Sequence, residues 1–245
     1  MKMPSISSLL LCSASLLVAA PLTGWAQTSI VVPNGSFESQ SAQFSPNGVN
    51  LNVDSWTKLP QPTSSQTDQA VGLFYNYPNN PGNTIDNADG FQVAYVFNVP
   101  GFGVQQTLTS ADGVYQVGNS YNLTVSLTAN NAVTSSDSFA LTLYYLNGTT
   151  PVTIGETDVA GGFSTKTHLF DSQVNIPAVQ ATDAWAGKAI GIQLSVASGT
   201  GSAYWDLDNV RLTSTTTVPE PSTWTLALVG LGGLWLTTRF FRVRR

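Results

Sequence analysis

The chain has 245 residues, and only 9% of them are charged. Residues 27–218 contain four Lys and Arg and 13 Asp and Glu, which gives this segment a net charge of −9. So acidic a body excludes nucleic acid as a partner, because almost nothing in it neutralises phosphates. The same stretch holds one His, two Glu and no Cys, which leaves few general bases or nucleophiles, so we expect a protein that is not an enzyme and has no catalytic residues.

Residues 1–26 have the features of a signal peptide. Lys2 gives a positive start, an apolar run follows from residue 6 to 20, and small residues lead up to Ala26. This pattern predicts export by the Sec machinery and cleavage after Ala26. The alternative is a lipoprotein signal acylated at Cys12. Lipidation requires a small residue directly before the Cys, however, and here three Leu precede it. The mature chain has no Cys, so its stability must come from its core and not from disulfides.

The body, residues 27–213, shows the alternation of β-strands. Apolar and polar residues alternate at 121–128, 139–145 and 190–196, and residues 91–99 form a further apolar run. Turn signals rich in Gly, Pro and Asn separate these segments. The pattern therefore predicts one all-β domain, an antiparallel β-sandwich.

Two short motifs near the ends of this body carry a resemblance. Residues 32–38 read Val-Pro-Asn-Gly-Ser-Phe-Glu, and residues 203–212 contain Trp-Asp-Leu-Asp-Asn-Val. Together with residues 103–108 and 118–123, they resemble the galactose-binding-like jelly rolls of carbohydrate-binding modules, although the segment 57–90 departs from that pattern. The resemblance implies a jelly-roll sandwich in which the opening motif packs beside the closing strand.

The closing strand also contains two carboxylates. Strand alternation places Asp206 and Asp208 on one face with Val210 and Leu212, and Arg211 on the other face. Because Val210 and Leu212 belong in a core, both carboxylates are expected on or beside the buried face. Burying even a neutral polar group without a hydrogen bond costs roughly 2–7 kcal/mol of folding free energy, and an unpaired charge costs more.

A calcium ion would satisfy these charges. In the resembling modules a structural Ca²⁺ lies between the Glu of the opening motif and the Asp of the closing one, which implies Glu38 and Asp208 here. Ca²⁺ prefers oxygen ligands of this kind. The alternative is that Asp208 accepts backbone N–H groups and no cofactor is present.

Aromatic residues are the candidates for sugar binding, because sugars stack on exposed rings. The loop 72–82 is rich in aromatic residues and Asn. The stacking candidates are Trp56, Phe74, Tyr75, Tyr77 and Trp185. The alternative is that these rings belong to the core.

The C-terminal segment carries the most specific motif. Residues 214–222 form a polar spacer with Pro219, Glu220 and Pro221, and residues 223–245 form an apolar helix with a basic tail of Arg239, Arg242, Arg244 and Arg245. The apolar stretch of 16 residues, 223–238, spans ~24 Å as a helix, which is short for a permanent membrane anchor. The arginines are expected to stay cytoplasmic.

This segment resembles the PEP-CTERM sorting signal, which implies recognition by exosortase, a membrane protease that cuts near the triplet. The alternative is an ordinary tail anchor. The resemblance predicts a protein first anchored in the inner membrane of a Gram-negative bacterium and then delivered to the cell surface or extracellular matrix. There it is expected to contact extracellular polysaccharide; the alternatives are a structural or adhesive protein without a glycan ligand, or a weak glycoside hydrolase that uses Glu38 and Glu156.

Overall fold

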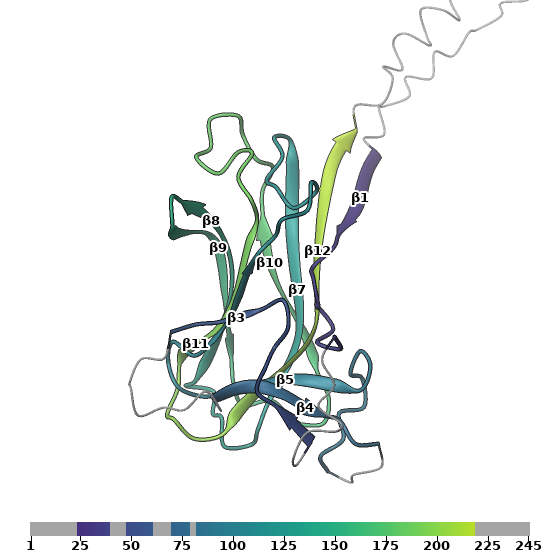
Figure 1. Cartoon of the computed structure of the whole chain (residues 1–245), viewed down its shortest axis with the longest axis vertical. Helices are drawn as coiled ribbons and strands as arrows, with labels where there is room; N and C mark the ends of the chain where they lie inside the picture. Colours follow the sequence, from purple (N-terminus) through teal and green to yellow (C-terminus); the bar gives the residue numbers. More distant parts are fainter. Residues whose placement is uncertain (1–23, 40–47, 61–69, 79–81, 219–245) are drawn as a thin grey trace, which may run out of the picture. The chain divides into compact units, whose positions relative to one another are not determined.

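Two antiparallel β-sheets pack face to face in the computed structural model, which describes residues 24–39, 48–60, 70–78 and 82–218 (Figure 1). The first sheet has the order β10-β7-β12-β5-β4-β2, with β1 beside β12, and the second has the order β3-β6-β11-β8-β9. The strands of the first sheet are β1 (Gly24–Ile30), β2 (Val49–Asn50), β4 (Val71–Tyr75), β5 (Gln92–Phe97), β7 (Asn119–Ala129), β10 (Phe170–Ile176) and β12 (Tyr204–Val218). Those of the second are β3 (Thr57–Lys58), β6 (Gly103–Thr107), β8 (Ser138–Asn147), β9 (Thr150–Ala160) and β11 (Gly191–Ser198).

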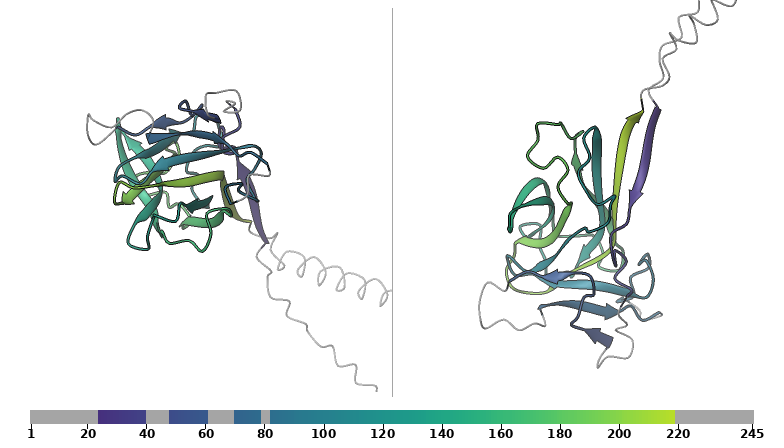
Figure 2. Two further views of the ribbon diagram at one scale, coloured as in Figure 1. Left: turned by 90° about the horizontal axis from the view of Figure 1, so that it is seen from below. Right: turned by 45° about the horizontal axis from the view of Figure 1, so that its top comes forward.

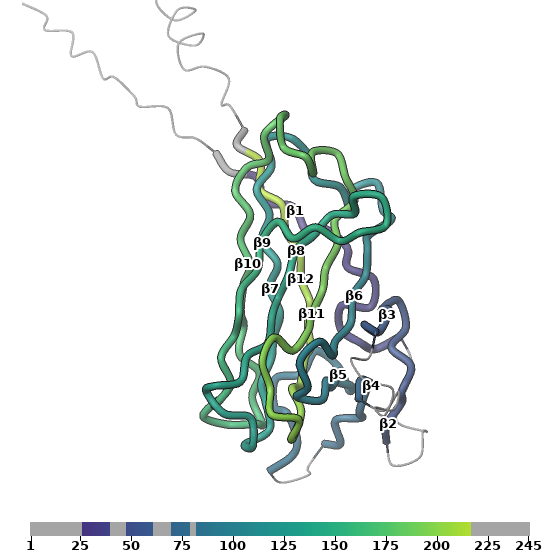
Figure 3. Tube along the Cα trace, turned by 90° about the vertical axis from the view of Figure 1, so that its left-hand side faces the viewer, coloured from purple at the N-terminus to yellow at the C-terminus, as the bar shows by residue number. Residues whose placement is uncertain are grey.

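The core lies between the two sheets, as the period-two patterns predict. Leu123, Val125 and Leu127 of β7 and Leu141 and Leu143 of β8 are all fully buried. At one side the edge strands β9 and β10 lie next to each other, so the two sheets meet there (Figure 3). The predicted fold, an all-β antiparallel jelly-roll sandwich, is confirmed, and no α-helix occurs among the described residues.

Strand β12 contains a bulge that the sequence pattern did not reveal. Its pairing with β7 slips between Asp208 and Arg211, and Asn209 adopts the left-handed conformation with φ of 50°. Trp205 before the slip and Leu212 after it both point into the core, because a bulge inserts a residue and reverses the alternation.

The predicted faces of β12 are therefore wrong. Asp206 pairs with Thr128 of β7 and Asp208 with Ser126, so both carboxylates lie on the outer face of the first sheet. Arg211 returns to this same outer face after the bulge, where it forms an ion pair of 2.7 Å with Asp171 of β10. Both aspartates are nevertheless buried, because the segments that precede β5 and β10 cover them.

The bulge docks onto the opening motif. The N–H of Val210 donates to the carbonyl of Gly35 at 2.8 Å. A Cβ at Gly35 would lie 2.5 Å from the carbonyl oxygen of Val210, so the close approach of the two backbones requires glycine. The predicted packing of the opening motif beside the closing strand is thus confirmed.

The end of β12 also differs from the prediction. Ser214, Thr215 and Thr216 were expected in a spacer, but they pair with Tyr121, Ser120 and Asn119 of β7. Ser and Thr are compatible with a half-buried strand when partners lie on both sides, and here β7 lies on one side and β1 on the other (Figure 2).

Several predicted segments lie outside the described residues. These are the signal peptide up to residue 23, the Pro219–Pro221 motif, and the apolar segment with its basic tail from residue 223 to 245. Within the ranges that the structure describes, no helix has the length and apolar character needed to cross a membrane.

A candidate ligand-binding pocket

A pocket of about 370 Å³ opens on the outer face of the first sheet, over β4, β5 and the beginning of β12. Its volume falls in the range of small-molecule sites, roughly 300–1,000 Å³. Its aromatic lining residues are Phe74, Tyr75, Tyr77, Tyr95, Phe97 and Tyr204. Its main polar ones are Asn76, Asn83, Asn130, Lys166 and Asp206.

Strand register builds the aromatic wall. Tyr95 of β5 lies directly across from Asp206 of β12, and Phe97 lies across from Tyr204, so all four side chains emerge on the same outer face. Gly72 lies across from Tyr95 on the other side, and a Cβ there would approach the Tyr95 hydroxyl to 2.9 Å. The missing side chain at residue 72 therefore leaves room for the Tyr95 ring.

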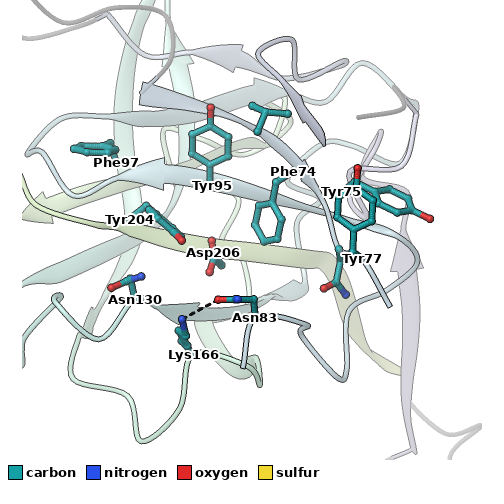
Figure 4. A pocket seen from close by; sticks show the side chains of 12 residues that line it. Phe74, Tyr75, Tyr77, Asn83, Tyr95, Phe97, Asn130, Lys166, Tyr204 and Asp206 are labelled. Carbon is teal, nitrogen blue, oxygen red and sulfur yellow. Dashed lines mark hydrogen bonds between the residues drawn. The ribbon is translucent and has the colours of Figure 1, made fainter. Parts of the chain in front are cut away.

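Asp206 lies between the aromatic rings and the polar wall (Figure 4). Its side chain is only 5% exposed, and its Oδ1 atom has no hydrogen-bond partner. Burial raises the pKa of the Asp206 carboxyl well above its ordinary value, and the positive charge of Lys166 offsets only part of this rise. The protonated, uncharged form is therefore favoured.

The opposite wall is built by two loop segments that hold each other. The Lys166 ammonium donates to the Asn83 Oδ1 at 3.0 Å (Figure 4). Next to it, Asn87 and Leu169 exchange two hydrogen bonds of 2.8 and 2.9 Å. The buried hydroxyl of Thr128 donates to the carbonyl of residue 165 at 2.8 Å, so the backbone beside Lys166 is fixed to β7.

The pocket brings together three of the five predicted stacking residues. Phe74, Tyr75 and Tyr77 line it, and the Tyr75 and Tyr77 rings pack edge to face at 4.7 Å. Trp56 lies elsewhere, buried in the core with its indole N–H donating to the Asn34 carbonyl at 3.0 Å. Trp185 packs partly buried against the core. That the pocket rings stack on a ligand stays a prediction.

The predicted calcium residues come together at one segment. The Glu38 Oε1 atom accepts the N–H groups of residues 91 and 92 at 2.8 and 2.7 Å. The Asp208 Oδ2 atom accepts the N–H of Asp89 at 2.6 Å, and Oδ1 accepts that of Asn209 at 2.7 Å. Asp208 therefore holds backbone N–H groups, as the alternative to calcium expects.

The negative charges of Glu38, Asp89 and Asp208 lie close together and would favour a bound cation. Burial raises the pKa of Asp208 to about 8; its backbone hydrogen bonds lower it, and the charges of Asp89 and Glu38 raise it further. A divalent cation would relieve this crowding, although among the described residues no group of three His, Cys, Asp or Glu side chains is arranged to hold one. A calcium ion at Glu38 and Asp208 stays a prediction.

The residues considered for hydrolysis are not brought together. Glu156 lies on β9, at the edge of the second sheet, where it accepts the Thr142 hydroxyl at 2.8 Å. Glu38 instead holds the backbone before β5 in the first sheet. His168 is paired with Asp86 at 2.6 Å on the exposed surface.

Sequence reasoning found Asp206 as a buried carboxylate but not as a site residue, and it did not select Tyr95, Lys166 or Tyr204. A signal was present: Asp206 follows Tyr204 by two positions, and Tyr95 stands in a strand with further aromatic residues on the same face. That Tyr95 and Asp206 are neighbours is decided by the pairing of β5 with β12, which no local pattern shows.

Two family models match the chain. One, described as HpiC1 cyclase, matches residues 28–213, and the other, described as the PEP-CTERM protein-sorting motif, matches residues 217–245. The predicted sorting signal is thus confirmed, and it marks the chain as an exported protein processed by exosortase. No curated protein matches the chain in sequence.

Solved structures with a similar fold include two cyclase structures from Fischerella sp. TAU. The Stig cyclase Fisc, in complex with (3Z)-3-(1-methyl-2-pyrrolidinylidene)-3H-indole, is 20% identical with a TM-score of 0.60, covering 77% of this chain and 98% of that one. A cyclase in complex with 4-(1H-indol-3-yl)butan-2-one is 21% identical with a TM-score of 0.59, covering 76% and 97%.

The CBM22-1 xylan-binding domain of Paenibacillus barcinonensis Xyn10C is also similar, at 13% identity and a TM-score of 0.42, covering 82% of this chain and 100% of that one.

Proposed function

Because the chain belongs to the HpiC1 cyclase family, whose model matches residues 28–213, we propose that this exported protein binds a small aromatic molecule in its pocket and that Asp206 donates a proton to it. The observation that carries the proposal is the buried Oδ1 atom of Asp206, which has no hydrogen-bond partner in the part of the chain that the structure describes. A buried polar atom without a partner is costly, so a ligand that completes its hydrogen bonding gains affinity.

The chemistry that this arrangement supports is acid-catalysed ring closure. The O–H bond of Asp206 breaks, its electron pair stays on the carboxylate, and the proton forms a new bond to an electron-rich carbon of the ligand. The resulting cation is attacked by a second group of the same molecule, and the proton lost on ring closure returns to Asp206. Aromatic rings such as those of Tyr95 and Tyr204 stabilise a cation above their faces.

Two further features of the pocket suit this role. The rings reduce the access of water to the reacting cation on the side of the aromatic wall, which limits its hydrolysis. The Lys166 ammonium stabilises the Asp206 carboxylate that proton donation leaves behind, because its positive charge favours the ionised form. The Fischerella cyclases named above were solved with ligands that contain an indole ring system, so indole is the ring with which to begin.

The test uses the purified mature protein in D₂O with indole. If Asp206 donates a proton, the C3 hydrogen of indole should exchange with deuterium faster than without the protein. The exchange is measured as the loss of the C3 proton signal in the NMR spectrum. Asp206→Asn keeps the shape but lacks the acidic proton, so the acceleration should disappear. Asp206→Ala, which removes the hydrogen-bonding group, should lower the affinity for 4-(1H-indol-3-yl)butan-2-one by roughly tenfold, the worth of one buried hydrogen bond. Asp171→Asn, which changes a surface carboxylate, is the matched control. Unchanged exchange in Asp206→Asn, or unchanged affinity in Asp206→Ala, would contradict the proposal.

Polysaccharide binding without catalysis is a second candidate function, favoured by a different feature. Asn83 and Asn130 line the same pocket as the Tyr75 and Tyr77 rings, and a pocket that combines rings with amides is suited to sugar faces and hydroxyls. In this case the processed protein would act at the cell surface or in the matrix of a Gram-negative bacterium. A glycan array distinguishes the two functions: retention that Tyr75→Ala abolishes, without indole binding, favours the sugar.

A further inference from the structure

Resting on the proposed aromatic ligand, we propose that this ligand also carries an anionic group, such as a carboxylate, and that Lys166 binds that group. Lys166 is the only cation among the residues that line the described pocket. The inference narrows the ligand to a class: a flat ring for the aromatic wall and an anion for the wall that faces it.

The first argument is the scarcity of cations. The stretch from residue 27 to 218 holds four Lys and Arg against 13 Asp and Glu, so a cation here readily finds a carboxylate. Arg211 does so with Asp171 at 2.7 Å. Within the residues that the structure describes, Lys166 forms no ion pair within 4.0 Å. Its ammonium group donates a hydrogen bond to the neutral amide oxygen of Asn83. A half-buried ammonium without a counter-ion favours an anionic ligand.

The second argument is the placement of the donors. An ammonium has three N–H donors, and Asn83 accepts one of them. The Asn130 Oδ1 atom accepts the N–H of Ala132 at 3.2 Å, so the NH₂ group of Asn130 is left as a second donor on the same side of the pocket as Lys166 (Figure 4). Two donors on one wall suit the two oxygens of a carboxylate.

The third argument concerns the charge near Lys166. Asp206 does not neutralise it at contact distance, since no ion pair within 4.0 Å joins the two. Burial also favours the uncharged form of Asp206. Lys166 is therefore the group of the lining to which an anion would bind, and an amine in place of the carboxylate would be repelled by it.

The experiment compares three ligands that share one ring and chain length: indole-3-propionate, 3-(indol-3-yl)propan-1-ol and 3-(indol-3-yl)propan-1-amine. Binding to the purified mature protein is measured by calorimetry at pH 7. The carboxylate should bind about tenfold more tightly than the alcohol, as a charge-assisted hydrogen bond implies, and the amine should bind most weakly.

Variants assign the preference to Lys166. Lys166→Met should remove it, Lys166→Arg should keep it, and Lys188→Met, which changes an exposed lysine, is the control. Asn83→Asp gives Lys166 a counter-ion from an exposed position and should also remove the preference, which covers the case in which Lys166→Met does not fold.

The outcomes separate this inference from the proposed function. Equal affinity for the carboxylate and the alcohol, or a preference that survives both Lys166→Met and Asn83→Asp, overturns the anionic ligand and leaves the aromatic pocket standing. If none of the three ligands binds with saturation, the proposed function fails and the inference fails with it.

Discussion

Asp206 and Asp208 are two buried acids with opposite surroundings, although only one residue separates them. Asp208 accepts backbone N–H groups with both oxygens, whereas the Oδ1 atom of Asp206 has no partner. A carboxyl group that folding leaves without a hydrogen bond lowers stability, and such residues persist where function requires them. At the residue scale, this contrast separates the acid that holds the fold, Asp208, from the acid that lines the pocket, Asp206.

The pH dependence of stability should report on Asp206. Since burial raises its pKa, the folded state binds more protons than the unfolded state above the ordinary Asp pKa of about 3.9, and the free energy of unfolding must fall as the pH rises from there. Asp206→Asn should reduce this fall to the part that Asp208 contributes, since the pKa of Asp208 is also raised, to about 8, as measured by urea unfolding at pH 4.5 and pH 7.5. An equally steep fall in the variant would show that Asp206 does not contribute.

Asp208 predicts the effect of metal removal. If calcium lies between Glu38 and Asp208, a chelator should lower the melting temperature of the mature protein, since a ligand that binds only the folded state stabilises it. Asp208→Ala should abolish that difference, whatever its own effect on stability. A melting curve that the chelator does not change would leave Asp208 with its backbone N–H partners alone.

At the scale of elements, the bulge in β12 decides what the strand presents to each side. It lets Trp205 and Leu207 fill the core before the slip and Val210 and Leu212 after it, while Asp206 remains on the outer face. The opening motif fixes the bulge through Gly35. The orientation of β12 after the slip therefore depends on a contact between the two ends of the domain.

Substitutions at the bulge should show this dependence. Asn209 has a φ of 50°, a conformation that costs most residues roughly 1–2 kcal/mol and β-branched ones more. We expect Asn209→Val to lower the free energy of unfolding by at least about that amount and Asn209→Gly to be tolerated, as measured by chemical denaturation. Equal stability of the two variants would argue against a bulge at this residue.

The elements were predicted where the information is local. Alternation along residues 121–128 and 139–145 identifies strands that become β7 and β8, because a strand side chain alternates regardless of its partners. The bulge at Asn209, the pairing of residues 214–216 and the meeting of Tyr95 with Asp206 depend on which strands are neighbours. Patterns in a single segment do not contain that information, so the fold class was predicted and the pocket was not.

At the scale of the whole molecule, the folded body and the sorting motif follow one another without a spacer. Strand β12 runs to Val218, and the Pro-Glu-Pro triplet begins at the next residue. A cut near the triplet would therefore leave the complete sandwich intact, which suits a protein that functions after its release from the membrane anchor.

Intact mass of the protein from the cell surface tests this processing. We expect a chain that begins at Gln27 and ends between residues 218 and 221, and a Glu220→Ala variant that accumulates with its C-terminal segment attached. Glu156→Ala, which removes a carboxylate far from the motif in sequence, is the control. A surface form that retains Arg245 would instead indicate a protein that keeps its anchor.

Pairing on both sides of β12 has a mechanical consequence. Ten of its residues are in register with β7, and β1 flanks the strand on its other side. The hydrogen bonds of an antiparallel pair run perpendicular to the strands, so a pull on the C-terminal end of β12 loads many of them at once in shear, instead of opening them one after another. Force applied at the C-terminal end of the sandwich is thus shared among many hydrogen bonds of β12.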